Sequence, residues 1–358
     1  MRVGVVVYGP LDERSGGYLY DRRVADRLRD QGDVVVRVTL PERSPRRALA
    51  HTLDPRVYSR LAAVDVDVLL VDELCHPSLV GIVGRLPQPT VAIVHHLRSS
   101  EPGPTFRRRV DRALEQRFLA GCDAYVFNGQ ATREAVGRLV DPAPAVIARP
   151  GVDRLGGDPP TPEVVRDRAT EGSLRVLVVG SVTPRKGHQT LLDGLADVDA
   201  PWRLDVCGAE PDPSHAAAVR ARAAGLGVAD CVHFHGRVSD ADLRAHLRKA
   251  HLFAMPSTYE GYGIAYVEAM RAGLPVVASS AGGAKEFVDG ENGVLVDPGD
   301  AEAVRAVVER FSQDRPALAR ASEAALTTAR SHPTWEETGD CIQAFLRSLL
   351  TAARSAGV

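Results

Sequence analysis

Short apolar segments rich in β-branched residues recur along this chain, and segments with helical patterning separate them. Strands that alternate with helices form parallel sheets with right-handed crossovers. The pattern therefore predicts an α/β fold with two doubly wound parallel sheets. The predicted strands are residues 3–7, 34–38, 68–71, 91–94 and 124–127 in the first half, and 175–179, 203–207, 232–235, 252–255, 276–278 and 294–296 in the second.

Proline and glycine concentrate between the two series, at residues 148–153 and 156–162, which is typical of a linker. We expect a first Rossmann-like domain over residues 1–155 and a second over residues 156–333, followed by a C-terminal helix within 334–358. A chain of 358 residues is long enough for two domains with separate cores. Ligands of such sheets bind at the carboxyl ends of the strands, which predicts a site in the cleft between the domains.

Charge and composition exclude several classes of partner. A net charge of −2 gives no bulk attraction to nucleic acid, so no nucleic-acid partner is expected. The chain starts directly with an apolar strand, and no apolar run approaches the roughly 20 residues of a membrane span, so we expect a cytoplasmic protein. The five cysteines are scattered without metal-ligand spacing, and we expect no metal.

Two carboxylates, Glu260 and Glu268, flank a glycine-containing turn that leads into a predicted helix over residues 264–272. Gly261 and Gly263 allow the backbone to approach a ligand, and the free amides of the first helical turn favour an anion such as a diphosphate. Two acids would also suit a solvated helix face. The glycines, with Pro256 before them, favour a site for a phosphorylated, polyhydroxylated ligand, and a nucleotide-sugar is such a ligand.

A second turn, after the first predicted strand of the second half, carries Arg185 and Lys186 at the start of a helix. Two cations at this place would neutralise a phosphate group of a bound ligand. The alternative is an ordinary basic turn on the surface. No GxGxxG motif follows the first strand of either half, which argues against a nicotinamide or flavin oxidoreductase.

Residues 256–263 and 267–270 resemble the paired-glutamate signature of retaining glycosyltransferases of family 4, and the similarity continues through residues 272–278, Gly282, Gly283 and 290–296. The resemblance implies a GT-B fold, in which two Rossmann-like domains face each other and the last helix, here residues 335–350, returns to the first domain. One position departs from the family pattern, because Ser181 stands where an arginine usually follows Gly180. Arg185 is the candidate to replace it in space.

The resemblance also implies roles for individual residues. His95, at the end of the fourth strand, would contact the transferred sugar, with His96 as the reserve, while Glu260 would orient the sugar and Glu268 the ribose. The implied catalytic residues are His95, Lys186 and Glu260, and the implied donor-binding residues are Gly16, Gly17, Arg185, Lys186, Gly261, Tyr262, Gly263, Ile264 and Glu268.

The function that follows is a retaining, metal-independent transfer of a hexose from a nucleotide-diphosphate-sugar to a hydroxylated acceptor of unknown class. A UDP-sugar is the first expectation and a GDP-sugar the second, with no further cofactor. Two alternatives remain open: a sugar-nucleotide epimerase or phosphorylase on the same scaffold, and a non-catalytic protein that binds a nucleotide-sugar.

A membrane surface is a less favoured partner. This hypothesis depends on a predicted amphipathic helix over residues 106–118, which with Arg43, Arg46 and Arg47 could form a basic face. Most such helices are solvated faces packed on a core.

Overall fold

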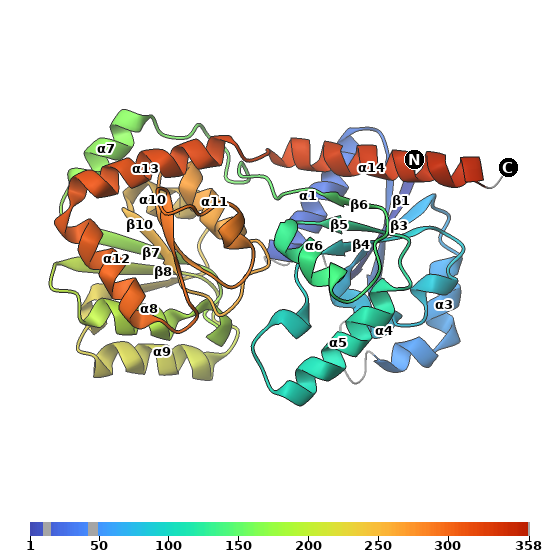
Figure 1. Cartoon of the computed structure of the whole chain (residues 1–358), viewed down its shortest axis with the longest axis horizontal. Coiled ribbons are helices and arrows are strands. Elements are labelled where there is room, and N and C mark those ends of the chain that lie inside the picture. The colour runs from blue at the N-terminus through green and yellow to red at the C-terminus, as the bar shows by residue number, and fades with distance from the viewer. Residues whose placement is uncertain (10–15, 42–48, 357–358) are drawn as a thin grey trace. The chain divides into compact units, whose positions relative to one another are not determined.

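The computed structural model describes residues 1–9, 16–41 and 49–356, which form two compact units (Figure 1). The first unit consists of Met1–Gly151 and Pro333–Val358, and the second of Val152–His332. In each unit, helices flank a parallel sheet.

The sheet of the first unit has six strands in its described residues, in the order β2-β1-β3-β4-β5-β6, and all neighbours pair in parallel. The inner strands β3, β4 and β5 are buried along their whole length, which explains their continuous apolar sequences. The strands are β1 (Arg2–Tyr8), β2 (Val34–Leu40), β3 (Val68–Asp72), β4 (Thr90–Val94), β5 (Ala124–Phe127) and β6 (Ala145–Ile147).

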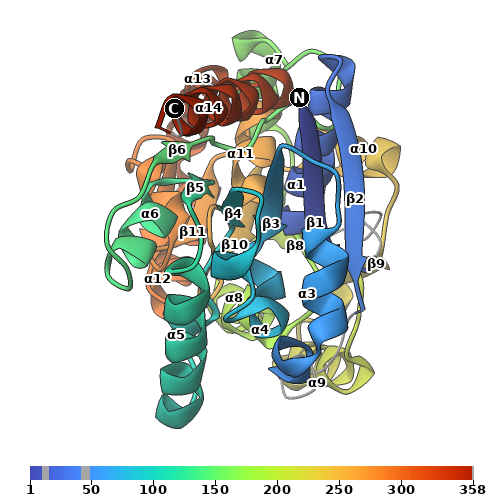
Figure 2. The ribbon, with the colours of Figure 1, turned by 90° about the vertical axis from the view of Figure 1, so that its right-hand side faces the viewer.

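Helices flank this sheet. Figure 2 is turned so that the first unit faces the viewer. No helix among the described residues has both the length and the apolar content required to cross a bilayer. The α-helices of the first unit are α1 (Gly16–Asp30), α3 (Pro55–Ala62), α4 (His76–Leu79), α5 (Thr105–Leu119), α6 (Gln130–Gly137) and α14 (Trp335–Ala356).

The second unit is described throughout, and its sheet has six parallel strands in the order β12-β11-β10-β7-β8-β9. Its strands are β7 (Leu174–Val179), β8 (Trp202–Cys207), β9 (Val232–Gly236), β10 (Leu252–Met255), β11 (Val276–Ser279) and β12 (Gly293–Val296). Its helices are α7 (Pro162–Thr170), α8 (His188–Ala196), α9 (Pro213–Gly225), α10 (Asp240–Lys249), α11 (Ile264–Arg271), α12 (Ala301–Gln313) and α13 (Arg315–Arg330).

Helix α14 packs against α1 of the first unit, as predicted, and extends six residues beyond the predicted end at residue 350. Arg27 of α1 donates two hydrogen bonds to the Asp340 carboxylate, at 2.7 and 2.8 Å. The aliphatic part of Arg27 lies so close to Gly339 that a Cβ there would be 2.4 Å from Arg27 Cγ. The backbone of Gly339 therefore packs closely on the Arg27 side chain, and a partly exposed ion pair joins the two helices.

Strand β6 was not predicted. It has only three residues, and Pro142, Pro144 and Pro150 lie around it, so it offers too short an apolar run to reveal a strand. The other strands lie within a few residues of their predicted positions.

Three of the buried acidic residues in the first unit lie close together: Asp21 of α1, Asp72 at the end of β3, and Glu73 directly after it. Burial raises the pKa of Asp21 to about 7. Burial, and then the charge of Asp21, raises the pKa of Asp72 to about 7. The pKa of Glu73 is also well above its ordinary value, because it is buried beside Asp72.

We predict that Gly151→Ala destabilises the first unit. A Cβ at this position would lie 2.2 Å from the backbone nitrogen of Trp335, where α14 begins, so the backbone must move. We expect a loss of about 1–3 kcal/mol, seen as a lower thermal midpoint. Gly103→Ala is the control, because nothing lies within 4 Å of a Cβ there. Equal midpoints for the two variants would show that this contact is not tight.

We also predict that Asp21 and Asp72 contribute stability that is lost as the pH rises from about 4 to about 7. The folded state holds protons on these two acids up to about pH 7, whereas an unfolded aspartate releases its proton near pH 3.9. Asp72→Asn resembles the protonated acid and removes its share of this loss, so the slope of the thermal midpoint against pH should be more positive than in the wild type. The exposed Asp26→Asn should leave it unchanged, and an unaltered slope in Asp72→Asn would contradict the assignment.

Candidate functional site

The turn before α11 is held in place by the neighbouring loop. Glu260 forms a β-bridge with Gly282, its backbone nitrogen donates to the Ala281 carbonyl at 3.1 Å, and its carbonyl accepts from Gly283 at 3.0 Å. A Cβ on Gly282 would lie 1.7 Å from the Glu260 carbonyl oxygen. The Gly282-Gly283 turn therefore serves to bring the Glu260 backbone to a fixed position.

Gly263 immediately precedes α11 with a φ of 93°, a conformation that favours glycine. A Cβ there would also lie 2.3 Å from the ring of Tyr266, whose hydroxyl donates to the Met255 carbonyl at 2.6 Å. No side chain caps α11, so the amides of Ile264 and Ala265 are available to an anion, while the Tyr266 amide donates to the Gly263 carbonyl at 2.9 Å.

Glu260 is buried, and its Oε1 atom accepts from two cations at once. Lys186 Nζ and Arg185 Nη1 each lie 2.8 Å from this oxygen, and Arg185 Nη1 also donates to the Tyr259 carbonyl at 3.0 Å. Burial alone would raise the pKa of Glu260, but the two cations outweigh it and hold the pKa below its ordinary value. The structure thus brings together three residues that were predicted from separate motifs.

The loop that carries Arg185 and Lys186 packs against the loop that carries Glu260, which explains why the three side chains lie together. Gly187, with a φ of 71°, lies between Lys186 and α8, and a Cβ there would be 2.0 Å from the Pro256 carbonyl oxygen. Thr258 donates its backbone N–H to the Arg185 carbonyl at 2.8 Å. The loop of residues 184–187 is therefore fixed against the loop that carries Glu260. The stem of Lys186 lies over Gly180, where a Cβ would be 3.0 Å from Lys186 Cε.

Glu268 lies on α11, also buried, and has a different partner. Arg154 binds it through two hydrogen bonds, Nε to Oε1 at 2.6 Å and Nη2 to Oε2 at 3.0 Å, and also reaches Asp240 at 2.9 Å. Sequence reasoning missed Arg154, because it lies in the expected linker, 114 positions from its partner, and no spacing rule connects the two.

Tyr262 has a buried ring, 5.3 Å from that of Phe287 between centroids, so the side chain belongs to the core of the second unit. Only its backbone can take part in ligand binding. Ile264 is half-buried as the first residue of α11, and Gly261 lies in the turn between Glu260 and Tyr262.

In the first unit, His95 follows β4 and is 7% exposed. Its Nε2 atom lies 3.0 Å from Asp21 Oδ1, its backbone nitrogen donates to Glu73 at 2.9 Å, and Asn128 donates to its carbonyl at 2.8 Å. Burial lowers the pKa of His95, which favours the neutral imidazole. The ring is therefore rigidly held among the buried acids described above.

Gly17, near the start of α1, packs on the His95 ring, and a Cβ there would lie 3.1 Å from His95 Cδ2. Gly16 is the first residue of the same helix and is exposed. His96 binds Glu101 through Nε2 at 3.0 Å. Sequence reasoning also missed Asp21, Asp72 and Glu73. Asp72 and Glu73 follow the apolar run of β3 at its carboxyl end, which is a signal that could have identified them.

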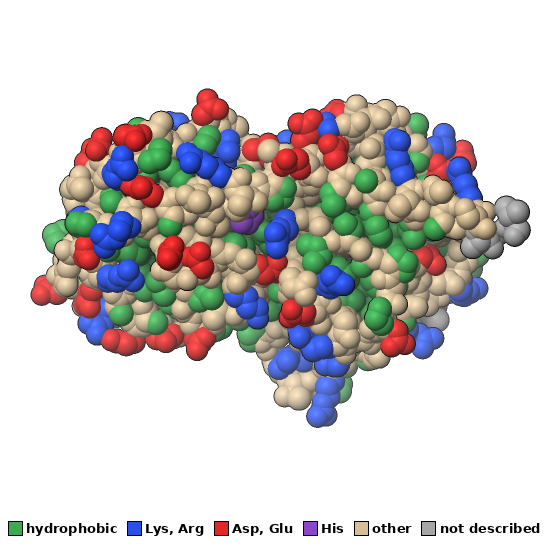
Figure 3. Space-filling view, turned by 45° about the horizontal axis from the view of Figure 1, so that its top comes forward, with side chains coloured by type: hydrophobic (Ala, Val, Ile, Leu, Met, Phe, Trp, Pro, Cys, Tyr) green, Lys and Arg blue, Asp and Glu red, His purple; other side chains and the backbone are tan. Residues whose placement is uncertain are grey.

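The predicted amphipathic helix corresponds to α5. Phe106 is 80% exposed and Val110 is 40% exposed, while Phe118 is buried. Only the end of this helix therefore packs on the core. Figure 3 shows acidic and basic side chains mixed over the visible surface, with basic ones gathered on a protrusion at the lower edge. Arg43, Arg46 and Arg47 lie outside the described residues.

Two family models match the chain. The model for glycosyltransferase family 4 matches residues 5–154, and the model for glycosyl transferases group 1 matches residues 163–328. A GDP-mannose-dependent alpha-(1-6)-phosphatidylinositol monomannoside mannosyltransferase of Mycolicibacterium smegmatis is 31% identical over 69% of this chain and 67% of its own length. A D-inositol 3-phosphate glycosyltransferase of Geodermatophilus obscurus is 34% identical over 64% of this chain, which spans only 53% of that relative.

Solved structures show the same fold. A sucrose-phosphate synthase of Thermosynechococcus elongatus superimposes with a TM-score of 0.83 over 98% of this chain and 99% of its own, at 20% identity. The HepE protein of Anabaena, solved with UDP and glucose, has a TM-score of 0.78 over 97% of this chain and all of its own, also at 20% identity. These comparisons confirm the predicted GT-B fold of two Rossmann-like units, and with the family models they show that the chain belongs to glycosyltransferase family 4.

Proposed function

We propose that this protein is a retaining glycosyltransferase that moves a hexose from a nucleotide-diphosphate-sugar to a hydroxylated acceptor. Family membership supports the class of reaction. We assign the reaction to this site because Arg185 and Lys186 both bind one oxygen of the buried Glu260 carboxylate. Two cations fixed in place before a ligand arrives suit a charge that develops on a leaving diphosphate.

Lys186 and Arg185, with the first-turn amides of α11, are the proposed diphosphate ligands. Arg185 and Lys186 reach the same carboxylate oxygen, which supports Arg185 as the replacement for the arginine that Ser181 does not supply. Glu260 has a positioning role in this proposal: it holds the cations together and orients them. Its low pKa keeps it ionised over the physiological range, so it is not suited to donate a proton.

Glu268 is proposed to accept hydrogen bonds from the ribose hydroxyls. Arg154 occupies one lone pair on each of its oxygens. A carboxylate offers about four such sites, so acceptor capacity remains. Arg154 would then orient Glu268 for the nucleotide.

The proposed step needs neither a metal nor a protein base. The bond between the anomeric carbon and the phosphate oxygen breaks, and its electron pair stays on the phosphate. The acceptor oxygen bonds to the anomeric carbon on the same face, and its proton passes to the departing phosphate oxygen. His95, held by Asp21, remains the proposed contact for the transferred sugar.

The relatives change which donor nucleotide we propose to test first. Sequence reasoning placed UDP first, whereas the name of the mycobacterial relative specifies GDP-mannose. We therefore propose GDP-mannose as the first donor to test and a UDP-hexose as the second. The structural neighbours with UDP are too distant in sequence to decide between the two.

We predict that Lys186→Ala weakens nucleotide-diphosphate binding by about tenfold or more, because a charged hydrogen bond contributes about 1.5–3 kcal/mol. Calorimetric titration with GDP and with UDP measures this. Lys249→Ala, on α10, is the matched control. If both variants bind like the wild type, the diphosphate site lies elsewhere.

The two glutamates should separate in their effects. We expect Glu268→Gln to weaken nucleotide binding by about tenfold, and Glu260→Gln to reduce mainly the rate of donor turnover, because its cations lose their common partner. Calorimetry and initial rates of donor hydrolysis test this pair, with the exposed Glu163→Gln as control. If Glu260→Gln hydrolyses the donor as fast as the wild type, Glu260 does not have the positioning role proposed here.

A further inference from the structure

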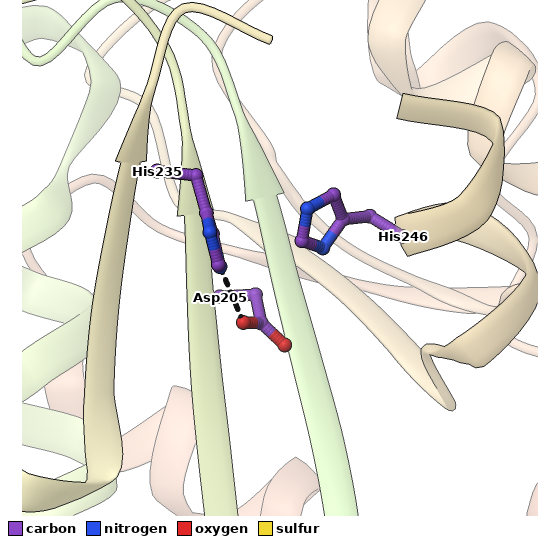
Figure 4. Close-up of side chains that lie close together, drawn as sticks. All are labelled: Asp205, His235 and His246. Carbon is purple, nitrogen blue, oxygen red and sulfur yellow. Dashed lines mark hydrogen bonds and ion pairs between the residues drawn. The ribbon is translucent and has the colours of Figure 1, made fainter. Parts of the chain in front are cut away.

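Three metal-ligating side chains meet at the edge of the second unit's sheet, away from the residues assigned above. Asp205 lies on β8, His235 on β9 and His246 on α10. Strand β9 is the outermost strand of this sheet. Figure 4 shows that the carboxylate and His235 project from neighbouring strands, and that the His246 ring approaches them from the helix.

The distances fit a shared cation. One donor atom from each residue lies within 4.8 Å of the other two. His235 Nε2 is 2.6 Å from Asp205 Oδ1, and the centroids of the two imidazole rings are 4.3 Å apart. The side chains of Asp205 and His235 are 14% and 27% exposed, so an ion from solvent can reach them.

A β-bulge places His235 in this group. Val206 pairs with Phe234 and Cys207 with Gly236, so His235 is the extra residue in the ladder. Such bulges are rare between parallel strands, and they re-aim side chains, often beside functional sites. The position of His235 is thus a local departure from regular sheet geometry.

The surrounding charges leave a coordination position free. Arg203 donates to Asp205 Oδ1 at 3.0 and 3.3 Å, and His235 bonds the same oxygen, so within this fully described unit Oδ2 has no protein donor.

We propose that Asp205, His235 and His246 form a binding site for a divalent transition-metal cation of the Zn²⁺ type. Two imidazole nitrogens and one carboxylate oxygen suit Zn²⁺, Co²⁺ or Ni²⁺ better than Mg²⁺ or Ca²⁺, which prefer oxygen ligands alone. The ion replaces the hydrogen bond between His235 Nε2 and Asp205, and the metal-bound imidazole, which is neutral, carries its single proton on Nδ1. Bound metal ties α10 to the outer strands β8 and β9, a bracing role that does not depend on glycosyl transfer.

The test uses the full chain, freed of metal by a chelator and then titrated with Co²⁺ and Zn²⁺. We expect one equivalent of Co²⁺ to produce a visible absorption spectrum that Zn²⁺ abolishes, and Zn²⁺ to raise the thermal midpoint. His246→Ala and His235→Ala should each weaken Zn²⁺ binding by more than about tenfold. His215→Ala, on α9, is the control and should bind like the wild type.

Arg203→Gln guards against variants that simply fail to fold. It removes a positive charge from Asp205, so it should tighten Zn²⁺ binding, which a general loss of structure cannot do. Absence of saturable Zn²⁺ binding in the wild type overturns the proposal. Equal Zn²⁺ affinity in His246→Ala and the wild type, or equally tight binding of Mg²⁺, also overturns it.

Discussion

The interaction on which the candidate site depends is the meeting of Glu260 with Arg185 and Lys186. The two cations neutralise the buried carboxylate, and removing Glu260 would leave Arg185 and Lys186 side by side without their common counter-charge. Two glycines allow the loops that carry these three side chains to pack closely. Gly187 and Gly282 permit backbone contacts that any side chain would prevent, and these contacts fix both loops. The proposed phosphate ligands are thus set in position by packing, before a ligand arrives.

The first unit organises its candidate residue by a different principle. His95 lies among buried acids, and its ring is held by Asp21 and packed under Gly17. Burial makes each acid costly to ionise, so the cluster favours neutral groups around a neutral imidazole. The sugar that we propose to bind here would be oriented by hydrogen bonds rather than by net charge. The charged half of the proposed chemistry belongs to the second unit.

The sequence predicted the elements that have a local signal. The period and length of the apolar segments indicated the strands, and the positions of the glycines indicated α11 and the basic turn. The order of these motifs along the chain indicated the family. Contacts between distant residues had no such signal: Arg154 binds Glu268 from a segment expected to be a linker, and Asp21 reaches His95 across 74 positions of the chain. Strand β6 was missed because three residues are too few to show a period. Long-range pairing depends on how the chain packs, which no single segment encodes.

The central claim is that the second unit binds the diphosphate of a nucleotide-sugar. Calorimetric titration of the intact protein with GDP and UDP, each beside its parent nucleoside and with a chelator present, tests it most directly. The account predicts saturable, chelator-insensitive binding of at least one diphosphate, and binding of the nucleoside weaker by about a hundredfold, because the cations and amides then have no anion to hold. Equal affinity for diphosphate and nucleoside, or no binding of either diphosphate, would contradict it.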